Sequence, residues 1–398
     1  MQLVEVKDSK TVGEFLMLPV KLFRQEKNWI RPLDKDIEDV FDPGKNKFFR
    51  HGKIIRWILL NDQKETIGRV AAFVNNKTKN KGNDQPTGGM GFFECINDQK
   101  AANVLFDACK EWLEAEEMDA MDGPINFGNR DKWWGLLVDG FEIEPNYGCQ
   151  YNFPYYQTLF EAYGFQTYFK QLTYGRKTRD PLSPSLAAKA DRIAKDPLYS
   201  FKHMRLKQID KYTEDFRIIY NQAWAGHGGV AKMSSLQAKA LIKQIKPIID
   251  EKIMWYGYYD TEPIAFFIML PEVNQIFKHV NGKLDWIGKI KCIYHKWRKS
   301  CHKMFGLVFG IVPAHQGKGV EGALIMAARQ MVQDDYHRYE DFEMNWIGDF
   351  NPRMLHVADQ VGGYIAKTHI TYRKLFDETK PFKRCPIIGD REKADSDS

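Results

Sequence analysis

The sequence predicts an α/β protein made of two similar domains in tandem, each with a central mixed, twisted β-sheet flanked by helices. Three observations predict this class. The length of 398 residues suits two domains that each bury a core. Both halves run from helices through a β-hairpin to an alternation of strand, helix, strand, helix and strand. The segment 305–331 places a strand, a glycine-bearing turn and a helix in direct succession.

The bulk composition excludes several classes of protein. Hydrophobic residues make up 43% of the chain and charged residues 28%, as in an ordinary globular protein. The formal net charge of +6 is too weak to predict nucleic-acid binding. The six cysteines form no CxxC pair, so we expect no zinc or redox site and no bound metal. Because no run is apolar enough to cross a bilayer and no signal peptide is evident, we expect a cytoplasmic protein with reduced thiols.

The first domain is expected to cover residues 1–178. Its helices follow from apolar residues at helical spacing, and its strands from short apolar runs bounded by polar turns. Pro19 lies within the first helical pattern and is expected to interrupt it. The predicted elements are a helix around 15–23, a hairpin of strands 54–60 and 66–74, a strand at 90–96, a helix at 100–116, a short strand at 123–128, a helix at 154–164 and a strand at 169–174.

A polar segment with two prolines, 176–184, is typical of a domain boundary. The second domain is therefore expected at 179–377, followed by a flexible polar tail at 378–398. Ser234 or Ser235 is placed to cap a helix. The predicted elements are helices at 185–194, 209–225, 234–245, 320–331 and 351–360, and strands at 201–206, 254–259, 263–270, 307–312, 342–347 and 369–375.

The ends of the two halves resemble each other. The segments 154–164 and 352–362 have the same length, and Asn152 or Asn351 closely precedes each. A strand that carries a lysine and then a tyrosine follows each segment. A repeat of this size indicates two copies of one domain, although chance similarity between such chain endings remains the alternative.

The stretch 305–326 contains the clearest candidate binding device. An apolar strand ends at Val312, a turn follows from Pro313 to Gly319, and a helix begins at Val320. Gly317 and Gly319 allow the backbone to turn tightly and to approach a ligand closely. The free N–H groups and the dipole of the helix start favour an anion, for which a pyrophosphate is well suited.

The pattern Val-Pro-x-x-Gln-Gly-Lys-Gly-Val-x-x-x-Leu, with Gln316 and Gly319 at the matching positions, resembles the pyrophosphate loop of the GNAT acyltransferase superfamily. Glu321 stands where that family has Gly or Ala. The resemblance covers nearly the whole chain, strongly in the second half, and implies two GNAT-like domains in tandem. It implies acyl-CoA or acetyl-CoA as co-substrate. The first half has Asn97, Asp98 and Gln99 in place of the loop, which indicates a degenerate copy. The cofactor-binding residues expected from the resemblance are Ile311, Val312, Gln316, Gly317, Lys318, Gly319, Val320 and Asn351.

In GNAT-like folds two parallel strands splay apart, the thioester lies between them, and an amine attacks it directly. Backbone N–H groups near Ile311 and Val312 would be free to stabilise the oxyanion. Three residues are candidates for the base, ranked in the order Glu343, His227 and Glu272. Each also has a purely structural alternative: Glu343 as a solvent-facing strand residue, His227 as a histidine at a helix C-terminus, and Glu272 as a turn residue. The family often protonates the thiolate with a tyrosine, but Ala358 occupies that position here.

The segment 289–303 mixes cations with Ile290, Ile293, Tyr294 and Trp297. As a helix it would present these four residues along one side, which suits an anionic membrane surface such as the inner membrane face. The alternative is a solvated linker helix whose apolar stripe packs on the domain. The membrane reading favours a lipid amine acceptor and a long-chain acyl donor, with bacterial ceramide-synthase-like enzymes as a precedent, whereas a small-molecule amine remains open.

The function expected is therefore an N-acyltransferase acting from acyl-CoA on an amine. Two alternatives remain open. One is a catalytically inactive GNAT-like binding or regulatory protein, which Glu321 and Ala358 favour. The other is an aminoacyl-tRNA-dependent transferase, although nucleic acid is not the expected partner.

Overall fold

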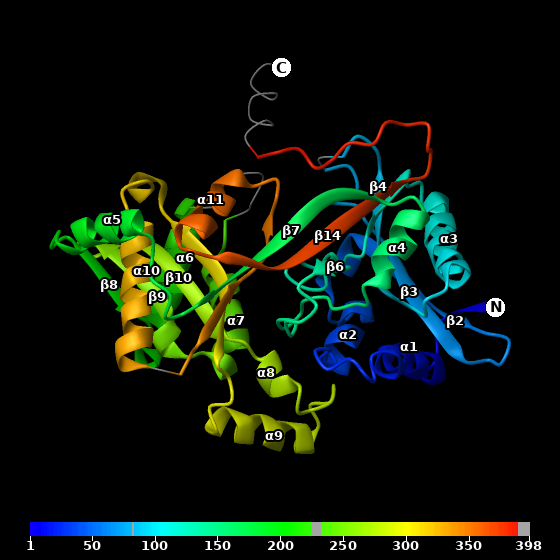
Figure 1. The fold of residues 1–398 in the computed structure, drawn as a ribbon, viewed down its shortest axis with the longest axis horizontal. Coiled ribbons are helices and arrows are strands. Elements are labelled where there is room, and N and C mark those ends of the chain that lie inside the picture. Colours follow the sequence, from blue (N-terminus) through cyan, green and yellow to red (C-terminus); the bar gives the residue numbers. More distant parts are fainter. Residues whose placement is uncertain (82, 224–231, 337, 389–398) are drawn as a thin grey trace.

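A computed structural model describes residues 1–81, 83–223, 232–336 and 338–388. One large mixed sheet runs through the protein, with helices on both of its faces (Figure 1). This mixed α/β architecture confirms the predicted fold class. Within the described residues, no helix is both long and apolar enough to cross a membrane, and no group of three or more potential metal ligands is found.

The first half follows the predicted order of elements. Pro19 lies in the last turn of the first helix, which continues to Leu22, so the predicted interruption is wrong. The ring removes the bond to the Phe15 carbonyl, which accepts from the Arg69 guanidinium at 2.7 Å instead, and the Pro19 carbonyl accepts the Phe23 N–H at 2.8 Å. The elements are β1 (Gln2–Glu5), α1 (Ser9–Leu22), α2 (Asp34–Phe41), β2 (Gly52–Leu60), β3 (Thr66–Asn75), β4 (Thr87–Cys95), α3 (Gln99–Ala115), β5 (Ala120–Gly123), β6 (Leu136–Asp139), α4 (Tyr155–Ala162) and β7 (Gln166–Lys177).

The second half repeats the core of this order. Ser234 caps its helix as predicted, because its side chain accepts the Gln237 N–H. The elements are α5 (Pro184–Ala194), β8 (Tyr199–His203), α6 (Ile209–Ala223), α7 (Ser235–Ile245), β9 (Met254–Tyr259), β10 (Glu262–Pro271), α8 (Asn274–Phe277), α9 (Trp286–Trp297), β11 (Lys303–Ile311), α10 (Val320–Gln330), β12 (Asp341–Met344), β13 (Ile347–Gly348), α11 (Pro352–Gln360) and β14 (Tyr364–Leu375).

The last strand of each half is exchanged with the other half. The sheet runs in the order β1-β2-β3-β4-β5-β14-β7-β12-β11-β10-β9-β8, with β6 paired to β14 and β13 to β7. Thus β14 pairs with β5 of the first half, whereas β7 pairs with β12 of the second half. These two strands lie side by side across the middle of the protein (Figure 1). The exchange joins the halves through backbone ladders. The boundary between 178 and 179 stays a prediction.

Each half also contains a parallel strand pair beside a helix. In the first half β4 pairs with β5, and in the second half β11 pairs with β12. The core of the second half packs β9, β10 and β11 against α6 and α10, while that of the first half packs β2, β3 and β4 against α3. The described part of the C-terminal tail contacts the sheet, where the Cys385 N–H donates to the Tyr168 carbonyl at 3.0 Å.

Candidate active site at the strand divergence

The parallel strands β11 and β12 diverge in the middle of β11. Their register ends where Gly306 lies opposite Met344, and the Asn345 N–H then donates to the Gly306 carbonyl at 2.9 Å. Beyond this point β11 continues to Ile311 along β10 only. Among the described strands, the edge of β11 that faces away from β10 thus has no partner between Leu307 and Ile311, as pairing with an extended ligand would require.

The direction of the backbone amides decides which of them face this opening. The Val312 N–H donates to the Ile264 carbonyl of β10 at 2.9 Å, so the expectation that this amide is free is wrong. Amides of an antiparallel strand point alternately to its two sides. The Ile311 N–H therefore points toward the opening, where it is placed to stabilise an oxyanion.

The loop after β11 has the geometry of an anion cradle. Gly317 and Gly319 have positive φ angles of 72° and 98°, which residues with side chains rarely adopt. A Cβ on Gly317 would meet nothing within 4 Å, so the loop is open to a ligand there. The Gln316 side chain donates to the Ile311 carbonyl at 2.9 Å and closes the loop onto the strand. Lys318 is exposed, which leaves its ammonium available to a phosphate.

The helix α10 offers its first-turn amides to such an anion. The Ala323 N–H donates to the Gly319 carbonyl at 3.1 Å, which leaves the amides of the preceding turn without intrahelical partners. Gly319 and Val320 are buried at the helix start, and Gly319 supplies no capping side chain. The half-buried Glu321 adds a negative charge in the same turn. The loop and helix start therefore fit a pyrophosphate, with Glu321 as the unfavourable group.

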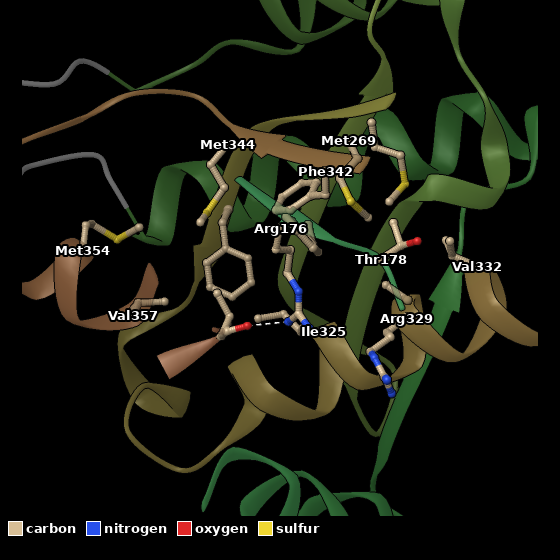
Figure 2. A pocket seen from close by; sticks show the side chains of 15 residues that line it. Arg176, Thr178, Met269, Ile325, Arg329, Val332, Phe342, Met344, Met354 and Val357 are labelled. Atoms are coloured by element: carbon tan, nitrogen blue, oxygen red, sulfur yellow. Dashed lines mark hydrogen bonds between the residues drawn. The ribbon is translucent and has the colours of Figure 1, made fainter. Parts of the chain in front are cut away.

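An apolar pocket lies beside the divergence, between the sheet and the helices α10 and α11 (Figure 2). Its walls include four methionines, which are flexible and adapt to irregular apolar guests. The Arg176 guanidinium lies at one end, where it donates to the Val361 carbonyl. The lining residues are Arg176, Thr178, Phe267, Met269, Met304, Phe309, Ile325, Ala328, Arg329, Val332, Phe342, Met344, Met354, Val357 and Val361.

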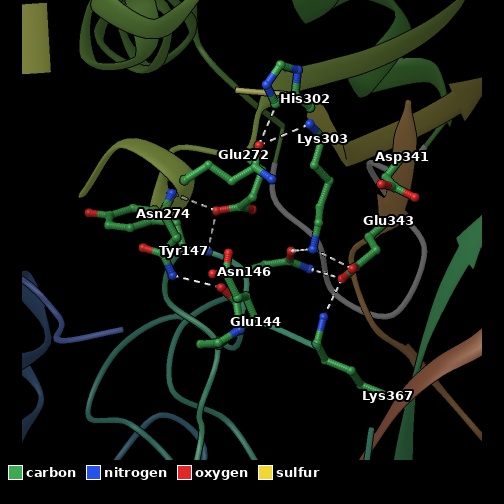
Figure 3. Close-up of polar contacts among 12 residues, drawn as sticks. Glu144, Asn146, Tyr147, Glu272, Asn274, His302, Lys303, Asp341, Glu343 and Lys367 are labelled. Carbon is green, nitrogen blue, oxygen red and sulfur yellow. Dashed lines mark hydrogen bonds and ion pairs between the residues drawn. The ribbon is translucent and has the colours of Figure 1, made fainter. Parts of the chain in front are cut away.

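The opposite face of the same two strands carries a buried charged cluster (Figure 3). Side chains alternate between the faces of a strand, so Met304 and Phe342 line the pocket while Lys303 and Glu343 point to the other side. Glu343 accepts bonds from Lys303 Nζ at 2.6 Å, Lys367 Nζ at 2.5 Å and Asn146 Nδ2 at 2.7 Å. Burial would raise the pKa of Glu343, but Lys367 and Lys303 outweigh it and hold this pKa below its usual value. Glu343 is thus an ionised, fully paired carboxylate.

Glu272 belongs to the same cluster, but its pKa is raised, whereas that of Glu343 is lowered. Its backbone N–H donates to the Lys303 carbonyl at 2.9 Å, and its Oε1 accepts the N–H groups of Tyr147 at 2.8 Å and Asn274 at 2.9 Å. The residue is 2% exposed. Burial raises the pKa of Glu272 to about 7, against the opposing effects of the Asn274 amide and Lys303. Glu272 can therefore exchange a proton near neutral pH.

Sequence reasoning missed the contribution of the first half to this cluster. Asn146 and Tyr147 come from the loop after β6, and the Tyr147 hydroxyl bonds to Asp36. Lys367 stood out in the sequence only as a repeated position. Nothing in the local pattern predicts these contacts, because they depend on the strand exchange, which leaves only β7 between β14 and β12. The structure therefore unites two of the three candidate bases, Glu272 and Glu343, in one cluster.

The remaining predicted residues are placed as follows. Asn351 caps α11, since its side chain accepts the Met354 N–H at 3.3 Å. Its side chain thus has a structural role in this arrangement. Ala358 is buried on α11 and supplies no acid. His227 lies outside the described residues.

The corresponding region of the first half is filled by its own side chains. Asp98 caps α3 by accepting the N–H groups of Lys100 at 2.7 Å and Ala101 at 3.1 Å, so a carboxylate already occupies the anion position. Beyond the pairing of β4 with β5, Tyr156 donates to Glu94 at 2.8 Å and accepts the Cys95 N–H at 3.0 Å. These contacts support the interpretation of a degenerate copy.

The comparisons with solved structures identify this arrangement. A tandem GNAT protein from the clavulanic acid biosynthesis pathway superimposes with a TM-score of 0.54 at 10% identity, covering 96% of this chain and 99% of that one. The chain has a tandem GNAT fold. A GCN5-related glucosamine N-acetyltransferase region of a fungal β-N-acetylglucosaminidase matches this chain with a TM-score of 0.53 at 11% identity, covering 94% of this chain and 38% of the other.

Two curated proteins are similar to this chain in sequence. Bacterial ceramide synthase from Caulobacter vibrioides is 25% identical over 379 residues, which cover 94% of this chain and 97% of the relative. Protein YghO from Escherichia coli is 22% identical over 364 residues, which cover 90% of this chain and 92% of the relative. No protein-family model matches the chain.

Proposed function

We propose that this chain is an N-acyltransferase that moves an acyl group from acyl-CoA to an amine by direct attack on the thioester. One observation carries the proposal: the paired ends of β11 and β12, which directly precede the opening, separate an apolar pocket on one face from a charged cluster on the other. Such an opening lets a donor and an acceptor meet from opposite sides of the sheet. The similarity to a protein named bacterial ceramide synthase supports acyl transfer.

The donor side is formed by the loop, the opening and the pocket. The first-turn amides of α10 and Lys318 would hold the pyrophosphate of CoA, whose thioester supplies an activated acyl group. The Ile311 N–H would stabilise the negative charge that develops on the carbonyl oxygen. The apolar walls, from Phe267 to Val361, favour a long acyl chain over an acetyl group.

The acceptor side is formed by the charged cluster. Glu272 is our proposed base, because its pKa of about 7 lets it accept a proton at neutral pH. It lies beside Lys303, about 26 Å along β11 from Ile311, so it would take the proton indirectly, through the charged cluster, and not from the attacking ammonium itself. Glu343 is the weaker candidate, since Lys303 and Lys367 already neutralise it. We propose a positioning role for Glu343. The name of the curated relative favours a lipid amine as acceptor, which would be reached at a membrane surface.

The first prediction tests this assignment by product formation. Palmitoyl-CoA and a sphingoid base should yield an amide detectable by mass spectrometry. Replacing Ala328, which lines the pocket and is 3% exposed, by Phe should fill the pocket and lower kcat/KM for palmitoyl-CoA by about tenfold or more.

The same substitution at the exposed Ala188 of α5, Ala188→Phe, is the matched control and should leave the rate unchanged. Thermal unfolding of both variants reports whether the fold is kept. Binding of acyl-CoA without any amide from short or long donors would contradict the proposal and favour the inactive binding protein.

A further inference from the structure

The helix α9 lies outside the layers of the fold. It belongs to residues 272–302, which connect the neighbouring antiparallel strands β10 and β11. In Figure 1 it lies at the lower edge of the protein, next to α8 and away from the sheet. The helix begins after its cap Asp285, so it covers Trp286–Trp297 and only the first part of the predicted segment 289–303.

One face of α9 exposes an uninterrupted set of large apolar side chains. The six residues of this face lie between Trp286 and Trp297, inclusive. At about 100° per residue, their positions fall within roughly a third of the helix circumference. The buried Gly288 lies on the opposite side, where a Cβ would meet the Lys283 carbonyl at 2.1 Å. The alternative of a solvated linker helix required this apolar face to pack on the domain, but the face is exposed instead. The exposed fractions are 71% for Trp286, 46% for Ile287, 56% for Ile290, 69% for Ile293, 51% for Tyr294 and 75% for Trp297.

Cations border this apolar face on both sides. By the same helical spacing, Lys289 and Lys296 lie along one flank, while Lys291 and Arg298 lie along the other, and all four are exposed. The sequence from 286 to 303 contains no acidic residue. Without a partner, this face would leave two tryptophans and three isoleucines in water, which is unusual for a protein surface.

The cations on both flanks of α9 favour an anionic bilayer over a second copy of this helix as the partner. A second copy of this helix would bring like charges together along both flanks. An anionic bilayer instead offers an apolar interior to the stripe and negative headgroups to both flanks. We propose that α9 docks this protein on an anionic membrane surface, with its apolar face in the boundary between headgroups and acyl chains. This inference goes beyond the acyl transfer proposed above and does not depend on it.

The docking helix is connected to the charged cluster by a short path. Helix α8 begins at Asn274, two residues after Glu272, and the Asn274 side chain donates to the Pro145 carbonyl at 2.9 Å. Docking through α9 would therefore hold the acceptor side of the site near the membrane. A lipid amine would then have a short route to the cluster.

The test is flotation of the full chain with vesicles. The wild-type protein should float with vesicles of equal parts phosphatidylcholine and phosphatidylglycerol, and about tenfold less with phosphatidylcholine alone. The variant Ile290→Ser, Ile293→Ser, Trp297→Ser should bind the anionic vesicles at least about tenfold more weakly. Leu236→Ser, on α7 and 80% exposed in the wild type, is the matched control and should bind like wild type.

A charge variant separates the two parts of the surface. Lys289→Gln, Lys291→Gln, Arg298→Gln should abolish the preference for anionic vesicles, whereas Lys100→Gln, Lys239→Gln, Lys243→Gln, at exposed positions elsewhere, should keep it. Equal flotation of the wild-type protein and the apolar-face variant would overturn the proposal. A wild-type dimer in sedimentation that the apolar-face variant converts to a monomer, without vesicle binding, would also overturn it. Neither result requires enzymatic activity, so failure here is distinct from failure of the acyl transfer.

Discussion

Replacing Glu272 by Gln should lower kcat by about 100- to 10,000-fold, the usual contribution of a general base. The side chain keeps its size and can still accept the Tyr147 and Asn274 amides, so the loss would come from the proton transfer. Steady-state amide formation from a long-chain acyl-CoA measures the effect. The substitution Glu144→Gln, at a half-buried carboxylate that pairs with Lys278, is the matched control and should keep the wild-type rate.

The pH dependence follows from the same carboxyl group. A base must be deprotonated to act, so the wild-type rate should rise as the pH increases through about 7, the pKa of Glu272 in the folded protein. The residual rate of the Gln variant should lack this rise. Because the folded pKa of Glu272 is raised, its contribution to stability is present below the ordinary carboxyl pKa and is lost as the pH rises through about 7. A Gln variant that keeps the wild-type rate and pH profile would remove Glu272 from the mechanism.

Replacing Glu343 by Ala should lower the free energy of unfolding by about 3 to 5 kcal/mol, because two buried lysines lose their shared carboxylate. Lys303 and Lys367 are 8% and 2% exposed, so water cannot readily replace the carboxylate. Urea unfolding at neutral pH measures the change. Additional replacement of both lysines by Met should recover most of the loss, since it removes the unpaired charges.

The half-buried surface pair between Glu214 and Arg217 provides the control, because Glu214→Ala should cost less than about 1 kcal/mol. The pKa of Glu343 is lowered in the folded protein, so its stabilising contribution is present above the ordinary carboxyl pKa. That contribution should be lost as the pH falls through the lowered value. A destabilisation no larger than that of this surface pair would show that the cluster does not depend on Glu343.

The sequence predicted the local elements well, because apolar periodicity and turn residues decide them locally. The strand, turn and helix from β11 to α10 and the cap at Ser234 are examples. The exchange of β7 and β14 could not be predicted, since either half could in principle pair with either strand and only long-range packing decides. The contacts of Asn146 and Lys367 with Glu343 follow from that exchange and were missed for the same reason.

The ranking of the candidate bases also depended on three-dimensional surroundings. A glutamate in a strand can be exposed, paired or isolated, and its sequence does not distinguish these states. The structure pairs Glu343 with two lysines and surrounds Glu272 with backbone amides instead. Burial raises the pKa of Glu272, whereas the two lysines lower the pKa of Glu343, so the order of the two candidates is reversed.

We expect an acyl-CoA to pass through the opening between β11 and β12. A crystal structure of the complex with a non-hydrolysable thioether analogue of palmitoyl-CoA tests it most directly. We expect the pyrophosphate on the first-turn amides of α10, the thioether sulfur beside Ile311 and the alkyl chain in the pocket that includes Ala328 and Phe342. An analogue bound elsewhere, with side chains closing the space between the two strands, would contradict this expectation.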